Sequence, residues 1–145
     1  MERKLLTISR YIEAPPDLVW TCYTDPAHML QWNFASEDWH CPRAENDLRP
    51  GGRLLARMEA RDGSMGFDFE GTYEQVRPCE QLRYRIADGR AVEIRFEPHG
   101  SGSVVQIAFE PERQHPEECQ QQGWQAILDS FSRHAERTAA TKGRV

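Results

Sequence analysis

Two tyrosines and several histidines are the candidate acids and bases of this sequence. Tyr73 and Tyr84 alternate with polar and charged neighbours, so we expect their hydroxyls on the covered face of a sheet, where they could orient a ligand or serve as weak acids. His28, His99 and His115 fall on a predicted short helix, in a turn and just before the last predicted helix. Histidines at such places are commonly solvated or capping residues.

Neighbouring reactive residues do not predict a catalytic pair. His40 and Cys41 are adjacent, and adjacent residues of a strand point to opposite faces, so they cannot form a dyad. Asp38 beside Trp39 offers at most one orienting carboxylate. The chain contains no GxSxG elbow, phosphate-binding loop, HExxH pair or dinucleotide fingerprint. The sequence therefore predicts no catalytic residues.

The cysteines also lack the spacing of a metal site. Cys22, Cys41, Cys79 and Cys119 are far apart, with no CxxC pair and no His or Cys at the short spacings that zinc sites use. We expect these thiols to be small buried hydrophobic groups. The sequence predicts neither a metal site nor a cofactor.

Composition limits the class of protein. The 145 residues are 39% apolar and 28% charged, with no apolar run long enough to span a bilayer and no secretory signal at the start. This predicts one soluble, cytoplasmic domain with no membrane insertion. The net charge of −5 argues against nucleic acid as a partner, because nucleic-acid-binding proteins are usually basic.

The elements that must position the candidate residues begin with a strand and two short helices. Alternation through KLLTISRYIEAP predicts a strand that Pro15 and Pro16 end. PPDLVWTCYTD has apolar residues at helical spacing after a proline start, and Asp25-Pro26 predicts the cap of a second helix over AHMLQW.

After Trp32 the hydrophobic pattern has period two for about 75 residues, with turn signals such as Asp62-Gly63 and Asp88-Gly89. Six further strands fit between these turns and predict an antiparallel meander with one covered and one solvated face. We interpret the acidic and basic residues that alternate with the apolar ones as a solvated face. Glycines 66 and 71 are interpreted as points where the sheet bends.

A helical pattern follows over about 116–138, with Trp124, Ile127, Leu128, Phe131 and Ala135 on one stripe. Its length would be roughly 35 Å, enough to cross a seven-stranded sheet. Gly123 lies inside this helix, and we expect that close packing against a neighbouring element requires a glycine there. The single domain is predicted over 1–140, with a frayed tail over 141–145.

This order of elements resembles the helix-grip, or START-like, superfamily called SRPBCC. The segments IEAPPDLVWTCYTDPAHMLQW, LRPGGRLLARM and FDFEGTYEQVRPCEQLRYR, with Gly123-Trp124, are similar to the branch of the activator of the heat-shock protein ninety ATPase. The resemblance implies an α+β fold in which a curved antiparallel sheet wraps the C-terminal helix.

A curved sheet cannot contact a straight helix along its whole length, so we expect a cavity between the two. The residues predicted to line it are mostly aromatic or aliphatic: Trp32, Phe34, Trp39, Met58, Phe67, Phe69, Tyr84, Phe96, Trp124, Leu128 and Phe131. Alternatively, these side chains fill the space as ordinary core.

The sequence leaves three functions open. An apolar lining without catalytic groups favours binding of a small hydrophobic molecule, lipid-like or polycyclic aromatic. The resemblance also implies a polyketide cyclase or aromatase, in which Tyr73, Tyr84 or a histidine would be acid or base, or a stress-response module that contacts a chaperone ATPase. Homodimerisation through a strand edge or the pair of short helices stays open as well.

Overall fold

The computed structural model describes residues 4–142 and contains ten helices and strands in this part of the chain. Their bounds, in chain order, are β1 Leu6–Ile12, α1 Pro16–Thr24, α2 Pro26–Trp32, β2 Trp39–Asn46, β3 Arg53–Ala60, β4 Gly66–Arg77, β5 Gln81–Ile86, β6 Ala91–His99, β7 Gly102–Phe109 and α3 Glu117–Lys142. The predicted α+β class and element order are confirmed. Among the described residues, no helix is long and apolar enough to cross a membrane.

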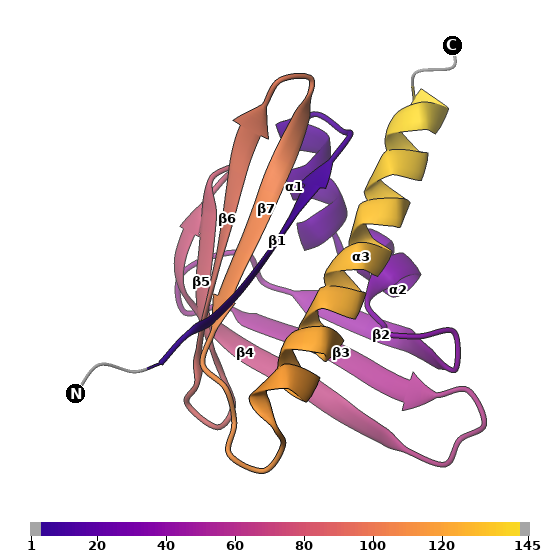
Figure 1. Cartoon of the computed structure of the whole chain (residues 1–145), viewed down its shortest axis with the longest axis vertical. Coiled ribbons are helices and arrows are strands. Elements are labelled where there is room, and N and C mark those ends of the chain that lie inside the picture. Colours follow the sequence, from indigo (N-terminus) through magenta and orange to yellow (C-terminus); the bar gives the residue numbers. More distant parts are fainter. Residues whose placement is uncertain (1–3, 143–145) are drawn as a thin grey trace.

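The strands form one antiparallel sheet in the order β1-β7-β6-β5-β4-β3-β2. The sheet is strongly curled, so that β2 to β4 run across the direction of β6 and β7 (Figure 1). Its register shifts between His40 and Arg43 in β2 and between Tyr73 and Gln75 in β4. Such irregularities bend a strand and increase its twist, and these two lie in the curled half of the sheet.

The two short helices follow the predicted cap chemistry. Pro16 and Pro26 are the first residues of α1 and α2, where a missing N–H costs little. The Asp25 side chain accepts a hydrogen bond from the Ala27 amide at 2.9 Å, which makes it the N-cap of α2. The indole of Trp32 donates to the carbonyl of Cys22 at 2.8 Å and ties α2 to α1.

Helix α3 crosses the concave side of the sheet and packs against β1, α1 and α2 (Figure 1). Arg10 of β1 reaches it with two hydrogen bonds, from Nε to Ser132 Oγ at 3.0 Å and from Nη1 to Asp129 Oδ1 at 2.9 Å. The helix continues through Lys142 instead of ending near residue 138, so Thr141 belongs to it. The rest of the predicted tail, residues 143–145, lies outside the described residues.

The core lies between the concave face and the helices, and the opposite face is wet as predicted. Arg57 pairs with Asp68, and Arg85 with Glu74, across neighbouring strands of the wet face. Phe67, a residue predicted to line the cavity, is 50% exposed, and Met65 nearby is 65% exposed. They lie at the tip of the β3–β4 hairpin, which extends beyond α3 (Figure 1).

Candidate functional site

A cavity of about 340 Å³ lies between α3 and the curled part of the sheet. Its walls come from α1, α2, β3, β4, β5, β7 and the first half of α3. The cavity exists because α3 rests on β1 at one edge of the sheet and on the short helices, which leaves it raised above β3 to β5. The expected gap between sheet and helix is thus present in the structure.

The cavity brings together many of the residues that the sequence places on its lining. Those on the lining are Trp32, Met58, Phe67, Phe69, Tyr84, Trp124 and Leu128. Phe96 and Phe131 lie instead in the core, where both pack edge-on against the ring of Tyr23. Trp39 and Phe34 are not part of the lining either. The Trp39 ring lies beside that of Phe67, with centroids 6.0 Å apart.

Trp124 forms the helix side of the aromatic wall. Its indole stacks on Phe109 with ring centroids 4.4 Å apart and an interplanar angle of 11°. Phe69 of β4 meets the same indole edge-on at 6.1 Å and the Tyr84 ring at 6.3 Å. Such pairs add to the stabilisation from burial and fix ring orientations. This part of the lining is therefore a continuous aromatic surface.

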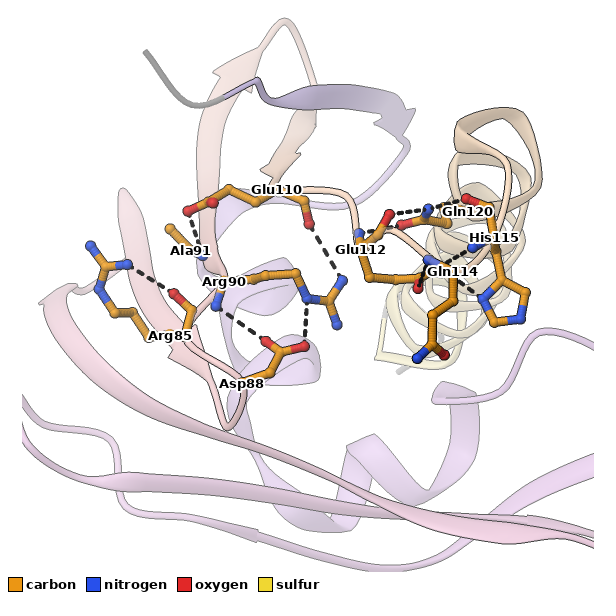
Figure 2. Close-up of polar contacts among 10 residues, drawn as sticks. Arg85, Asp88, Arg90, Ala91, Glu110, Glu112, Gln114, His115 and Gln120 are labelled. Carbon is orange, nitrogen blue, oxygen red and sulfur yellow. Dashed lines mark hydrogen bonds and ion pairs between the residues drawn. The ribbon is translucent and has the colours of Figure 1, made fainter. Parts of the chain in front are cut away.

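One end of the cavity is polar, and sequence reasoning missed it. Arg90, Glu112 and Gln120 line this end, from the β5–β6 turn, the β7–α3 connection and the first turns of α3 (Figure 2). Arg90 donates from Nε to Asp88 at 2.8 Å and from Nη1 to the Glu110 carbonyl at 3.4 Å. Because Arg90 and Glu112 occupy a turn and a connection, no periodic pattern marked them.

Glu112 is a charged group held in place by the residues just before α3. Its carboxylate accepts hydrogen bonds from the Gln114 amide at 2.7 Å and from the amide and ring of His115 at 2.9 and 2.8 Å (Figure 2). Desolvation alone would raise the pKa of Glu112, but these hydrogen bonds and the His115 charge together lower it. Glu112 is therefore ionised at neutral pH.

The three cavity tyrosines are poor acids. Burial raises the pKa of Tyr23, Tyr73 and Tyr84, and the neighbouring tyrosines raise those of Tyr23 and Tyr84 further. The Tyr73 hydroxyl donates to Asn46 Oδ1 at 2.8 Å, an interaction that opposes the shift. Each hydroxyl is thus protonated at neutral pH and can orient a ligand as a hydrogen-bonding group.

Gly123 differs from its predicted role. A Cβ atom built on it would meet no atom within 4 Å, and the residue lines the cavity, so close packing does not explain this glycine. Gly71 is tightly surrounded: a Cβ there would come within 2.8 Å of the Tyr84 ring. Glycine at 71 lets Tyr84 lie against β4, whereas glycine at 123 leaves space beside the helix.

Replacing Gly123 with alanine is expected to stabilise the protein by up to about 1 kcal/mol, since glycine is a poor residue inside a helix and the methyl group has room. Urea unfolding followed by circular dichroism measures the change. A loss of stability would contradict the open space beside this position.

Two further expectations need correction. Cys119 is exposed and Cys79 half-buried, so only Cys22 and Cys41 behave as buried thiols. His28 is not a solvated or capping residue: its Nδ1 lies 2.9 Å from Nε2 of His134, and Cys22 is close to both. Burial, with help from His28 and Arg137, lowers the pKa of His134. Cys22, His28 and His134 could hold a metal ion.

Known proteins resemble this chain over nearly its whole length. An AHSA1-like protein from Aeromonas hydrophila is 40% identical, with a TM-score of 0.88, and the match covers 93% of this chain and 94% of that one. Chr148 from Cytophaga hutchinsonii is 43% identical, with 91% and 92% covered and a TM-score of 0.78. CV1439 from Chromobacterium violaceum is 26% identical, with 92% and 98% covered and a TM-score of 0.81.

No curated protein sequence matches the chain significantly. The family described as "Activator of Hsp90 ATPase homolog 1-like protein" matches residues 13–136, which include α1, α2, β2 to β7 and most of α3. Since this match spans most of the chain and agrees with the fold, the protein belongs to the AHSA1-like family, within the START-like superfamily.

Proposed function

We propose that the protein binds one small apolar molecule in the cavity under α3. The observation that carries the proposal is a space of about 340 Å³ under α3, with walls that are mostly aromatic and aliphatic. Small-molecule sites commonly have volumes of about 300–1,000 Å³. An engineered apolar cavity of about 150 Å³ takes up benzene, so this one has room for a molecule of about two fused rings or a short acyl chain.

The polar end favours a ligand with one anionic or hydrogen-bonding group. Arg90 uses Nε and Nη1 for contacts with Asp88 and Glu110, and its Nη2 has no hydrogen-bond partner among the described residues. Its side chain is only 24% exposed, so an ion pair there would be partly shielded from water. The ligand is therefore expected to be amphipathic, with its apolar body against Trp124 and its polar group near Arg90.

The state of the ionisable lining residues favours binding over turnover. Tyr73 and Tyr84 have raised pKa values and stay protonated, so they cannot act as bases at neutral pH. Glu112 has a lowered pKa, and its oxygens accept three hydrogen bonds from Gln114 and His115. A cyclase would need a base poised near neutral pH, whereas these groups suit holding and orienting a molecule.

A titration with naphthalene-2-sulfonate tests the proposal, because this probe joins two fused apolar rings to one anionic group. We expect saturable binding of one probe per chain, with a change in the fluorescence of Trp124. Gly123→Leu should weaken binding by at least about tenfold, a free-energy change of about 1.4 kcal/mol, because its side chain would enter the cavity.

Gly123→Ala is the matched control, since its methyl group adds little volume at the same position. It should keep nearly the affinity of the unmodified protein. Arg90→Gln should weaken binding of the anionic probe but leave binding of a neutral naphthalene derivative unchanged. Equal affinity of Gly123→Leu and the unmodified protein would show that the probe binds elsewhere and would overturn the proposed function.

A further inference from the structure

A second cluster of reactive side chains lies where the three helices meet, apart from the cavity. It contains Cys22 of α1, His28 of α2 and His134 of α3. One ligand atom of each residue lies within 4.8 Å of the other two, and the two imidazole nitrogens are 2.9 Å apart. None of the three residues lines the cavity. This cluster has no role in the proposed function.

We propose that Cys22, His28 and His134 bind one zinc ion that joins the three helices. One thiolate and two imidazoles form a ligand set of the kind that zinc uses, with three protein ligands and a fourth position for water. Tetrahedral zinc with bonds of about 2.0–2.3 Å needs ligand atoms about 3.3–3.6 Å apart. The two imidazole nitrogens, 2.9 Å apart, are closer than this range, whereas all three ligand atoms lie within 4.8 Å of one another. Small rotations of the side chains would bring the three atoms to the distances that zinc needs.

The burial of the cluster also suits a metal ion. The Cys22 side chain is fully buried, whereas both histidines are half-buried, so the histidine side of the cluster is the side nearer to solvent. The carbonyl of Cys22 accepts the hydrogen bond from the Trp32 indole, which fixes α1 against α2 before any ion binds. Two of the three ligands therefore come from a helix pair that is already held together.

Metal binding requires a change of protonation that balances. The Cys22 thiol loses its proton to solvent and binds as a thiolate. The hydrogen bond between the histidines breaks, and the proton that it holds moves by exchange with water to the other nitrogen of the same ring. Both facing nitrogens then offer lone pairs to the ion. The positive charge of Arg137 lies near His134 and opposes the binding of a cation there. The negative charge of the Cys22 thiolate offsets this repulsion.

Calorimetric titration of the full chain with zinc chloride, after treatment with a chelator, tests the site. We expect one zinc ion per chain and a rise in Tm of roughly 5–10 °C at a hundredfold excess over Kd. Cobalt(II) should give the absorption bands of a tetrahedral site with a thiolate-to-cobalt charge-transfer band. Cys22→Ala should remove that band, and His28→Gln and His134→Gln should each weaken zinc binding by at least about tenfold.

The matched control is the double variant His115→Gln/Cys119→Ala, which removes an exposed histidine just before α3 and an exposed cysteine in its first turn. It should bind zinc as tightly as the unmodified protein. Circular dichroism identifies variants that do not fold. The cobalt spectrum of the unmodified protein tests the site even if one of the variants does not fold. The proposal is overturned if zinc binding does not saturate, if the thiolate band is missing, or if only the control variant loses affinity.

Discussion

Replacing Phe131 with alanine is expected to destabilise the protein by about 3–5 kcal/mol, the range for truncating a fully buried phenylalanine. Phe131 is fully buried in the middle of α3. Its ring meets those of Tyr23 and Trp32 edge-on, each with centroids 5.0 Å apart, so the phenyl group joins α3 to both short helices. Its removal would leave a void among rings that two other helices hold in place.

Urea unfolding followed by tryptophan fluorescence and circular dichroism measures this loss. Phe67→Ala is the matched control, because it removes the same side chain from a position that is 50% exposed. Phe67→Ala should lower the free energy of unfolding clearly less than Phe131→Ala does, although it also changes the lining of the cavity. Equal costs for the two variants would mean that Phe131 does not anchor the helices as the structure indicates.

Replacing Gly52 with alanine is expected to destabilise the protein by about 1–3 kcal/mol, the range for overpacking of a tight site. Gly52 is buried in the turn before β3, and a Cβ there would overlap the carbonyl oxygen of Asp47 and come within 2.9 Å of that of Arg49. Both obstacles are backbone atoms, so a side-chain rotation cannot relieve them. The Gly52 carbonyl also accepts a hydrogen bond from the Tyr73 amide at 2.9 Å.

Gly123→Ala gives the contrast for this experiment, since the same chemical change should have the opposite sign in open space. The Tm of both variants can be read in one series of thermal unfolding scans. Displacement of the turn should also disturb Tyr73, whose hydroxyl donates to Asn46. A Gly52→Ala variant as stable as the unmodified protein would show that the backbone around Gly52 has room for a side chain.

The fold could be predicted almost completely because its signals are local. Strand alternation, the prolines that open α1 and α2, and the Asp25 cap each act within a few residues, and the structure confirms them. The exposure of Met65 and Phe67 could not be predicted in this way. Their exposure depends on how far the β3–β4 hairpin extends past α3, which is a matter of tertiary arrangement (Figure 1).

The cavity could be predicted only in part for the same reason. Residues such as Phe69 and Tyr84 alternate on strands, so their side of the sheet is readable from the sequence. Arg90 and Glu112 lie in connections, where no period assigns a direction to a side chain. His28 and His134 are separated by 106 positions, so the rule of short spacing between metal ligands could not bring them together.

The pairing of β1 with β7 has a consequence for how the chain folds. Leu6 at the start of β1 pairs with Phe109 at the end of β7, so the first strand of the chain pairs with the last one, across a long stretch of sequence. Helix α3 then packs on β1 through Arg10. Pairing between strands that are distant in sequence slows folding, because the loop between them must close first. Until β1 and α3 dock, the concave apolar face stays open to water, so enclosure of the cavity is expected to be the late and aggregation-sensitive stage of folding.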